Sequence, residues 1–111
     1  MKSTQETVCH RIKLKPNSLE KVYAWAKELN SRKEEALATL QDEGVSVESV
    51  FLEQTNEGDF LIYYMRLENT DKAKAIAAKS KHAIDEYHKQ FKIATWASNT
   101  QLQLLVDLDL L

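Results

Sequence analysis

The 111-residue sequence predicts an α+β fold with the element order β-α-β-β-α-β and one further strand at the C-terminus. Three observations predict this class. The first run alternates apolar and polar residues, two central runs are rich in β-branched and aromatic residues, and two segments repeat apolar residues at helical spacing. Because the length matches one ordinary domain, we expect residues 1–111 to form a single domain.

The first strand is expected in the segment VCHRIKLK, after a flexible start over residues 1–7. Its alternate residues form one mainly apolar face, as in a strand that covers a core on one side. Arg11 and Lys13 lie on the other face. There they need acidic partners such as Glu48, or an anionic ligand.

A long helix is predicted from Asn17 to about Glu43. Asn17 is a favourable N-cap with Glu20 three residues later, and Gly44 suits the C-terminal cap. Trp25 is expected on the flank of the apolar stripe. At about 100° per residue, that stripe contains Leu19, Val22, Tyr23, Ala26, Leu29, Ala36, Leu37 and Leu40.

Two β-rich runs, VSVESVFLE and DFLIYYMRLE, are joined by a predicted hairpin turn over Asn56–Asp59. Every residue of Phe60–Met65 is apolar or aromatic, so both faces of that strand need burial. Two helices can cover only one face of the sheet. We therefore expect a homodimer, in which a second copy packs sheet against sheet.

A second helix is predicted from its cap at Thr70 to about Phe91, followed by a fourth strand near FKIATWA. Small residues in the first half of its inward stripe allow close approach or leave a void. His88 lies at the edge of this stripe, with His82 nearly opposite. The stripe contains Ala73, Ile76, Ala77, Ser80, Ala83, Ile84, Tyr87 and Phe91.

The tail QLQLLVDLDLL alternates leucine or valine with glutamine or aspartate, which predicts a fifth strand over residues 101–111. We expect this strand at the dimer interface, added to a shared sheet edge. The alternative is that the tail folds back over its own sheet.

This element order is that of the split-βαβ, or ferredoxin-like, fold, with an antiparallel sheet and two helices on one face. The layout resembles the dimeric α/β-barrel superfamily, whose members pair two such sheets. The segments CHRIKLKPNSLEKVYAWAKELN, LATLQDEGVSVESVFLE and HAIDEYHKQFKIATW look like an uncharacterised bacterial family of that superfamily. This resemblance implies the fold and no activity.

Two other branches are more distantly similar. The sugar mutarotases carry a His and a Trp-Pro-Glu segment in the first helix, where this chain reads LNSRKEEALATL. This departure argues against mutarotase chemistry. The cofactor-independent monooxygenases have a pocket between the helices and the sheet, and the resemblance implies the same place here.

Several polar residues could line such a pocket. Lys33 falls in the middle of the apolar stripe, so it either extends to the rim or meets a buried acid or a ligand. Tyr63 and Tyr64 point to opposite faces, so one of them faces the helices. The candidate ligand-binding residues are Asn30, Lys33, Tyr63, Tyr64, Ser80 and Tyr87.

His88 is the candidate catalytic residue, as a proton carrier or hydrogen-bond donor near neutral pH. The alternative is a histidine that is satisfied at a helix edge. No metal site is expected, because Cys9 is the only cysteine and His82 and His88 do not share a helical face. No cofactor is expected either, since the only glycines, Gly44 and Gly58, form no phosphate loop.

The net charge of −2 and the absence of basic runs argue against a nucleic acid or an anionic membrane as partner. The sequence contains no apolar run of membrane-spanning length and no signal peptide, so a cytoplasmic location is expected.

Three functions fit the sequence. The first is a homodimer that binds a small apolar or amphipathic molecule between helices and sheet. The second is a cofactor-independent enzyme, of monooxygenase or isomerase type, that uses the same pocket. The third is a structural or regulatory dimer without a ligand. A void lined by Lys33 and His88 would favour the first two, and a filled core with Lys33 paired to an acid would favour the third.

Overall fold

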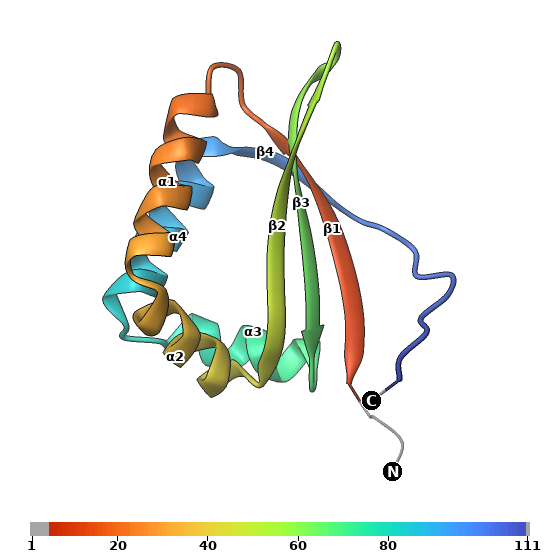
Figure 1. The fold of residues 1–111 in the computed structure, drawn as a ribbon. Coiled ribbons are helices and arrows are strands. Elements are labelled where there is room, and N and C mark those ends of the chain that lie inside the picture. The colour runs from red at the N-terminus through yellow and green to blue at the C-terminus, as the bar shows by residue number, and fades with distance from the viewer. Residues whose placement is uncertain (1–4, 111) are drawn as a thin grey trace.

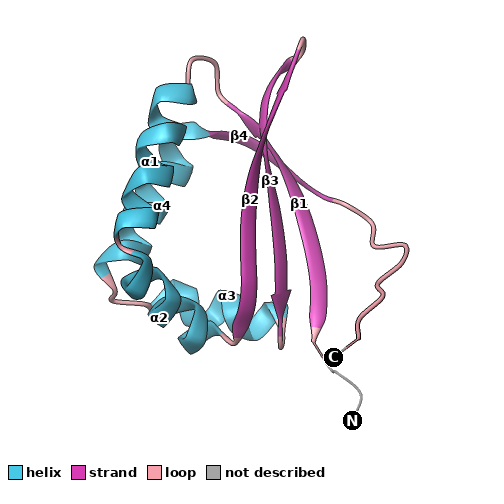
Figure 2. Cartoon of the chain, in the orientation of Figure 1, coloured by secondary structure: helices cyan, strands magenta, loops and turns pink. Residues whose placement is uncertain are grey.

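Four strands form one antiparallel sheet in the computed structural model, which describes residues 5–110 (Figure 1). The strand order is β2-β3-β1-β4. The helices lie on one face of the sheet and leave the other face open (Figure 2). In chain order the elements are β1 (Glu6–Leu14), α1 (Leu19–Ser31), α2 (Lys33–Glu43), β2 (Val45–Thr55), β3 (Gly58–Leu67), α3 (Thr70–Lys79), α4 (Ala83–Thr95) and β4 (Trp96–Gln101).

This architecture confirms the predicted α+β, ferredoxin-like fold, with each predicted helix divided into two. The hairpin turn is also confirmed, because β2 and β3 pair from Thr55 and Gly58 onward. Residues 1–4 of the expected flexible start lie outside the described part of the chain. Glu6 already belongs to β1, and its carboxylate accepts hydrogen bonds from the backbone N–H and the hydroxyl of Thr70, both at 3.0 Å.

The first predicted helix breaks at Arg32, whose backbone leaves the helical region at φ −114° and ψ 39°. The guanidinium group of Arg32 bridges the break by binding Glu28 of α1 and Glu35 of α2. Within α1 itself, before the break, the inward face is also rotated relative to the predicted stripe. Tyr23, predicted to face inward, is 57% exposed, whereas Trp25, predicted on the flank, is only 4% exposed.

The start of α1 also differs from the prediction. Asn17 is not the N-cap, because it adopts a left-handed conformation with φ 62° in the preceding turn. The N-cap is Ser18, whose hydroxyl turns back and donates to the Lys15 carbonyl at 2.7 Å. At the end of α2, Gly44 has φ 72°, which confirms the predicted left-handed C-cap.

The second predicted helix breaks between Lys79 and Ala83, where Ser80 and His82 have extended backbones. The cap of α3 is Asn69 rather than Thr70, since the Asn69 side chain accepts from the Lys72 N–H. Helix α4 continues through Thr95. The fourth strand therefore begins later than the predicted segment.

The main core lies between the helices and the sheet. Trp25 of α1 stacks on Phe91 of α4, with ring centroids 4.5 Å apart and an angle of 7° between the planes. Tyr63 of β3 packs against Trp25 from the sheet side. The buried members of this core are Ile12, Leu14, Val22, Trp25, Leu61, Tyr63 and Phe91.

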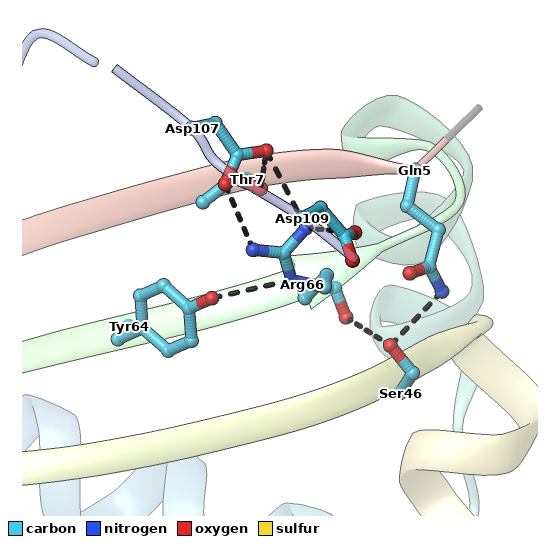
Figure 3. Close-up of polar contacts among 7 residues, drawn as sticks. All are labelled: Gln5, Thr7, Ser46, Tyr64, Arg66, Asp107 and Asp109. Carbon is cyan, nitrogen blue, oxygen red and sulfur yellow. Dashed lines mark hydrogen bonds and ion pairs between the residues drawn. The ribbon is translucent and has the colours of Figure 1, made fainter. Parts of the chain in front are cut away.

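The C-terminal tail, residues 102–110, does not form the predicted fifth strand within the chain. Its first N–H donates to the Cys9 carbonyl at 2.8 Å, and the tail then leaves the sheet. It runs past β1 on the side away from the helices (Figure 1). There Asp107 and Asp109 each form an ion pair with Arg66 at 2.9 Å (Figure 3). In the single chain the tail thus folds back over its own sheet, and its place at a dimer interface stays a prediction.

Arg11 lies on the same open face, but its acidic partner is not the expected Glu48. Its Nε atom lies 2.9 Å from Glu53, and its guanidinium group stacks 3.7 Å from the centre of the Phe60 ring. Glu48 cannot pair with Arg11, because it lies on the face of β2 that meets the helices. No helix among residues 5–110 is long and apolar enough to cross a membrane.

Candidate functional site

A cavity of about 330 Å³ lies between α1, α2, α4 and β2 and opens to solvent on one side. Its walls combine apolar side chains with a few polar ones. The apolar lining residues are Trp25, Ala26, Leu29, Ala36, Leu37, Leu40, Val50 and Ile84. The polar lining residues are Asn30, Lys33, Thr39, Glu43, Glu48, Asp85 and His88.

The cavity forms because the chain turns at Arg32, so that α1 and α2 contribute separate walls. Two of the lining residues, Ala26 and Ala36, have side chains too small to fill the space. A hollow with mainly apolar walls and a few convergent polar groups is the usual form of a small-molecule site.

The structure brings three of the predicted site residues together, namely Asn30, Lys33 and His88. The Asn30 side-chain N–H donates a hydrogen bond to the Ala26 carbonyl at 2.8 Å, and this bond does not use the Asn30 side-chain oxygen. Lys33 is exposed at the cavity rim. Among residues 5–110, no carboxylate lies within ion-pair distance of Lys33.

The other predicted ligand-binding residues lie elsewhere. Tyr63 faces the helices and packs behind His88, with ring centroids 6.2 Å apart, but does not line the cavity. Tyr64 lies on the open face, where its hydroxyl accepts a hydrogen bond from Arg66 at 3.2 Å (Figure 3). Tyr87 packs against the main core. Ser80 lines a neighbouring cavity.

That second cavity, also about 330 Å³, lies at the break between α3 and α4. The Ser80 hydroxyl donates to the Asp85 carboxylate. His82 Nε2 lies 2.8 Å from the Asp42 carboxylate, which raises the pKa of His82. His82 lines this second cavity and His88 lines the first, and the interruption of the helix at Ser80–His82 brings Ser80, His82 and Asp85 together.

His88 has a defined tautomer. The indole N–H of Trp25 donates to His88 Nδ1 at 3.0 Å. Indole nitrogen is only a donor, so Nδ1 must be unprotonated and a neutral His88 carries its proton on Nε2. Burial lowers the pKa of His88 to about 4, and the nearby charge of Lys92 acts in the same direction. At neutral pH His88 is therefore a hydrogen-bond donor rather than a proton carrier.

Two carboxylates of the cavity, Glu43 and Glu48, were not predicted as site residues. Burial is the main cause that raises the pKa of Glu43 to about 7, followed by the charges of Asp85, Glu48 and Asp42. Burial also raises the pKa of Glu48. One sequence signal pointed to Glu48, since it occupies the same face of its strand as Val50.

Among the described residues, no group of three or more His, Cys, Asp or Glu side chains is arranged to hold a metal ion. The polar residues that line the cavity carry hydrogen-bonding and acid–base groups. These groups can orient a ligand or move a proton.

Residues 5–111 match the model of a protein family described as a family of unknown function (DUF6176). The chain belongs to this family. No curated protein matches the chain in sequence.

Solved structures show the same fold at low sequence identity. PA3566 from Pseudomonas aeruginosa is 13% identical with a TM-score of 0.59, over 94% of this chain and 97% of that chain. A dimeric protein of unknown function and ferredoxin-like fold from Bacteroides fragilis is 18% identical with a TM-score of 0.57, over 90% and 94%. A candidate antibiotic biosynthesis monooxygenase from Bacteroides thetaiotaomicron is 16% identical with a TM-score of 0.57, over 97% and 94%.

Proposed function

We propose that this member of the DUF6176 family is a homodimer that binds a small apolar or amphipathic molecule in the cavity between α1, α2, α4 and β2. The observation that carries the proposal is the cavity itself, with its apolar walls, Lys33 at the rim and His88 inside. A ligand with an apolar body and a carboxylate or carbonyl head matches this lining. The open cavity and the unpaired Lys33 support a ligand-binding dimer over a purely structural one.

Apolar surface outside the cavity supports the homodimer. On the open sheet face, Phe51 is 60% exposed and Val47 is 40% exposed. In the tail, Leu105 and Leu108 are 81% and 90% exposed. Surface of this kind is characteristic of an interface. The Bacteroides fragilis protein with the same fold is described as dimeric.

A cavity-filling variant tests the binding proposal, with 1-anilinonaphthalene-8-sulfonate as an apolar probe that carries an anionic head. We expect the wild-type protein to enhance the probe's fluorescence saturably. Ala36→Trp should weaken binding at least about tenfold, because the indole would occupy the cavity. Ala38→Trp is the matched control, since Ala38 is exposed on the same helix and does not line the cavity. Equal binding by all three proteins would contradict the proposal.

A cofactor-independent enzyme that uses the same cavity is the second candidate function. It is favoured by the presence of Glu43 and His88 in one cavity. The monooxygenase descriptions of proteins with this fold supply no residues for the reaction, because at 16% identity they support the fold alone.

A further inference from the structure

We propose, building on the ligand-binding role above, that the cavity catalyses proton transfer at the carbon next to a carbonyl group, with Glu43 taking the proton and His88 donating a hydrogen bond to the carbonyl oxygen. Both side chains line the same apolar cavity, Glu43 from the end of α2 and His88 from the middle of α4. Together they supply a base and an electrophilic donor, the two groups that such a reaction needs.

The donor role of His88 follows from its contacts. The Trp25 indole N–H donates a hydrogen bond to His88 Nδ1, and the two rings are stacked with centroids 5.7 Å apart. Phe91 also stacks on it, at 6.2 Å. These contacts fix the ring plane and the tautomer, so the Nε2–H group is held ready before a ligand enters. A preoriented donor in a partly desolvated site stabilises developing negative charge more strongly than water does.

The base role of Glu43 follows from its position. It is the last residue of α2, where the negative end of the helix dipole disfavours a second negative charge. Asp85 of α4, Glu48 of β2 and Asp42 of α2 act in the same direction, and Lys92 of α4 acts against them. A carboxylate in these surroundings holds a proton more tightly than ordinary glutamate, and its pKa of about 7 suits a base that works at neutral pH.

The step is balanced without a co-reactant. The Glu43 carboxylate removes a proton from the α-carbon, and the C–H electron pair becomes the C=C bond of an enolate. The carbonyl π electrons move to the oxygen, which accepts the hydrogen bond from His88 Nε2–H. Protonated Glu43 exchanges its proton with solvent through the open cavity and delivers a solvent-derived proton to the same carbon, or it delivers its proton to the far end of a conjugated system. The net reaction is an exchange or a 1,3-proton shift.

The lining defines the substrate class as a small enolisable carbonyl compound with an aromatic or branched apolar body. The cavity of about 330 Å³ accommodates a single ring with a short side chain. Lys33 at the rim favours a carboxylate next to the carbonyl. Phenylpyruvate has all three features and serves as the probe.

The test measures the exchange of the C3 hydrogens of phenylpyruvate for deuterium in D₂O by proton NMR. Wild-type protein should accelerate exchange over buffer, and Glu43→Gln should lose that acceleration by about 100-fold or more. Glu34→Gln is the matched control, because Glu34 is exposed on the same helix and does not line the cavity. The Glu34→Gln protein should exchange the C3 hydrogens of phenylpyruvate at the wild-type rate.

The pH profile gives a second readout. The carboxylate of Glu43 is the active form, so the wild-type rate should rise as the pH increases through about 7 and then level off. The Glu43→Gln protein, once circular dichroism has verified that it is folded, should lack this rise. A merely structural role for Glu43 would not produce that difference.

The inference and the proposed function fail differently. Phenylpyruvate that displaces the anilinonaphthalene probe without exchanging its hydrogens would overturn the proton transfer and leave ligand binding intact. Exchange that is equally fast in Glu43→Gln, or no acceleration by wild-type protein, would also overturn it. Binding of the anilinonaphthalene probe that is unchanged by Ala36→Trp would overturn the proposed function itself.

Discussion

At the residue scale, two histidines at the start and in the middle of α4 have opposite surroundings. His88 is half-buried beside Trp25, and its partial removal from water lowers its pKa to about 4. His82 is exposed and pairs with Asp42, which raises its pKa above the usual 6.5. The same residue type therefore serves as a neutral donor at one position and a titrating ion-pair member at the other.

NMR titration checks this assignment. Between about pH 5.5 and about pH 8, the His88 ring signals should stay constant, because the ring remains neutral over that range. The His82 signals should titrate above pH 6.5, and Asp42→Asn should shift that titration downward by removing the favourable charge. Titration of His88 near neutral pH would contradict the assigned tautomer and the donor role.

The sequence indicated His88, Lys33 and Asn30 as cavity residues, because each lies on or beside the inward face of a predicted helix. It did not indicate Glu43, because the surroundings that raise its pKa come from β2 and α4 as well as from its own helix. Proximity of that kind depends on tertiary packing. Tyr64 could not be excluded in advance, since alternation shows that neighbours face opposite ways without showing which faces the helices.

At the element scale, the end of α2 depends on Gly44. Its φ of 72° lies in the left-handed region, where other residues carry a steric penalty. A Cβ atom at this position would also lie 2.9 Å from Oε2 of Glu68, the end of a flexible side chain that can move aside. The cost of a substitution should therefore come mainly from the backbone.

Urea unfolding tests this expectation. Gly44→Ala should lower the free energy of unfolding by about 1–2 kcal/mol. Gly44→Asn should cost less, because asparagine tolerates the left-handed region better. Equal stability of the wild-type and alanine proteins would show that the cap conformation is not important for stability.

The helix breaks show the limit of sequence periodicity. Neither Arg32 nor the Ser80–His82 segment contains proline or glycine, so local propensity permits a continuous helix at both places. The Ser80–His82 break is accompanied by a tertiary contact, the His82–Asp42 pair, whereas the Arg32 break is bridged by local ion pairs to Glu28 and Glu35. Strands and turns were easier to predict, because their signals are local: apolar–polar alternation indicates a strand, and Gly58 indicates the hairpin turn.

At the scale of the whole molecule, the helices cover one face of the sheet, and only the tail crosses the other. The helices and the aromatic core bury the first face. Over the second, the tail is attached through Asp107 and Asp109 to Arg66 (Figure 3). Tail leucines such as Leu105 and Leu108 remain exposed. The apolar run Phe60–Met65 predicted this need for cover. The path of the tail was not predictable, because a second copy and the chain's own sheet offer similar apolar contacts.

Native mass spectrometry of protein purified from cells tests the central claim of a ligand-binding homodimer most directly. We predict twice the chain mass of 12.8 kDa, with the additional mass of a bound small molecule. Phe51→Asp, on the open sheet face, should yield a monomer because the charge would be buried at the interface. Tyr23→Asp is the matched control and should remain dimeric, since Tyr23 is similarly exposed, at 57%, on α1. A monomeric wild-type protein, a dimer without added mass, or a dimeric Phe51→Asp variant would contradict the account.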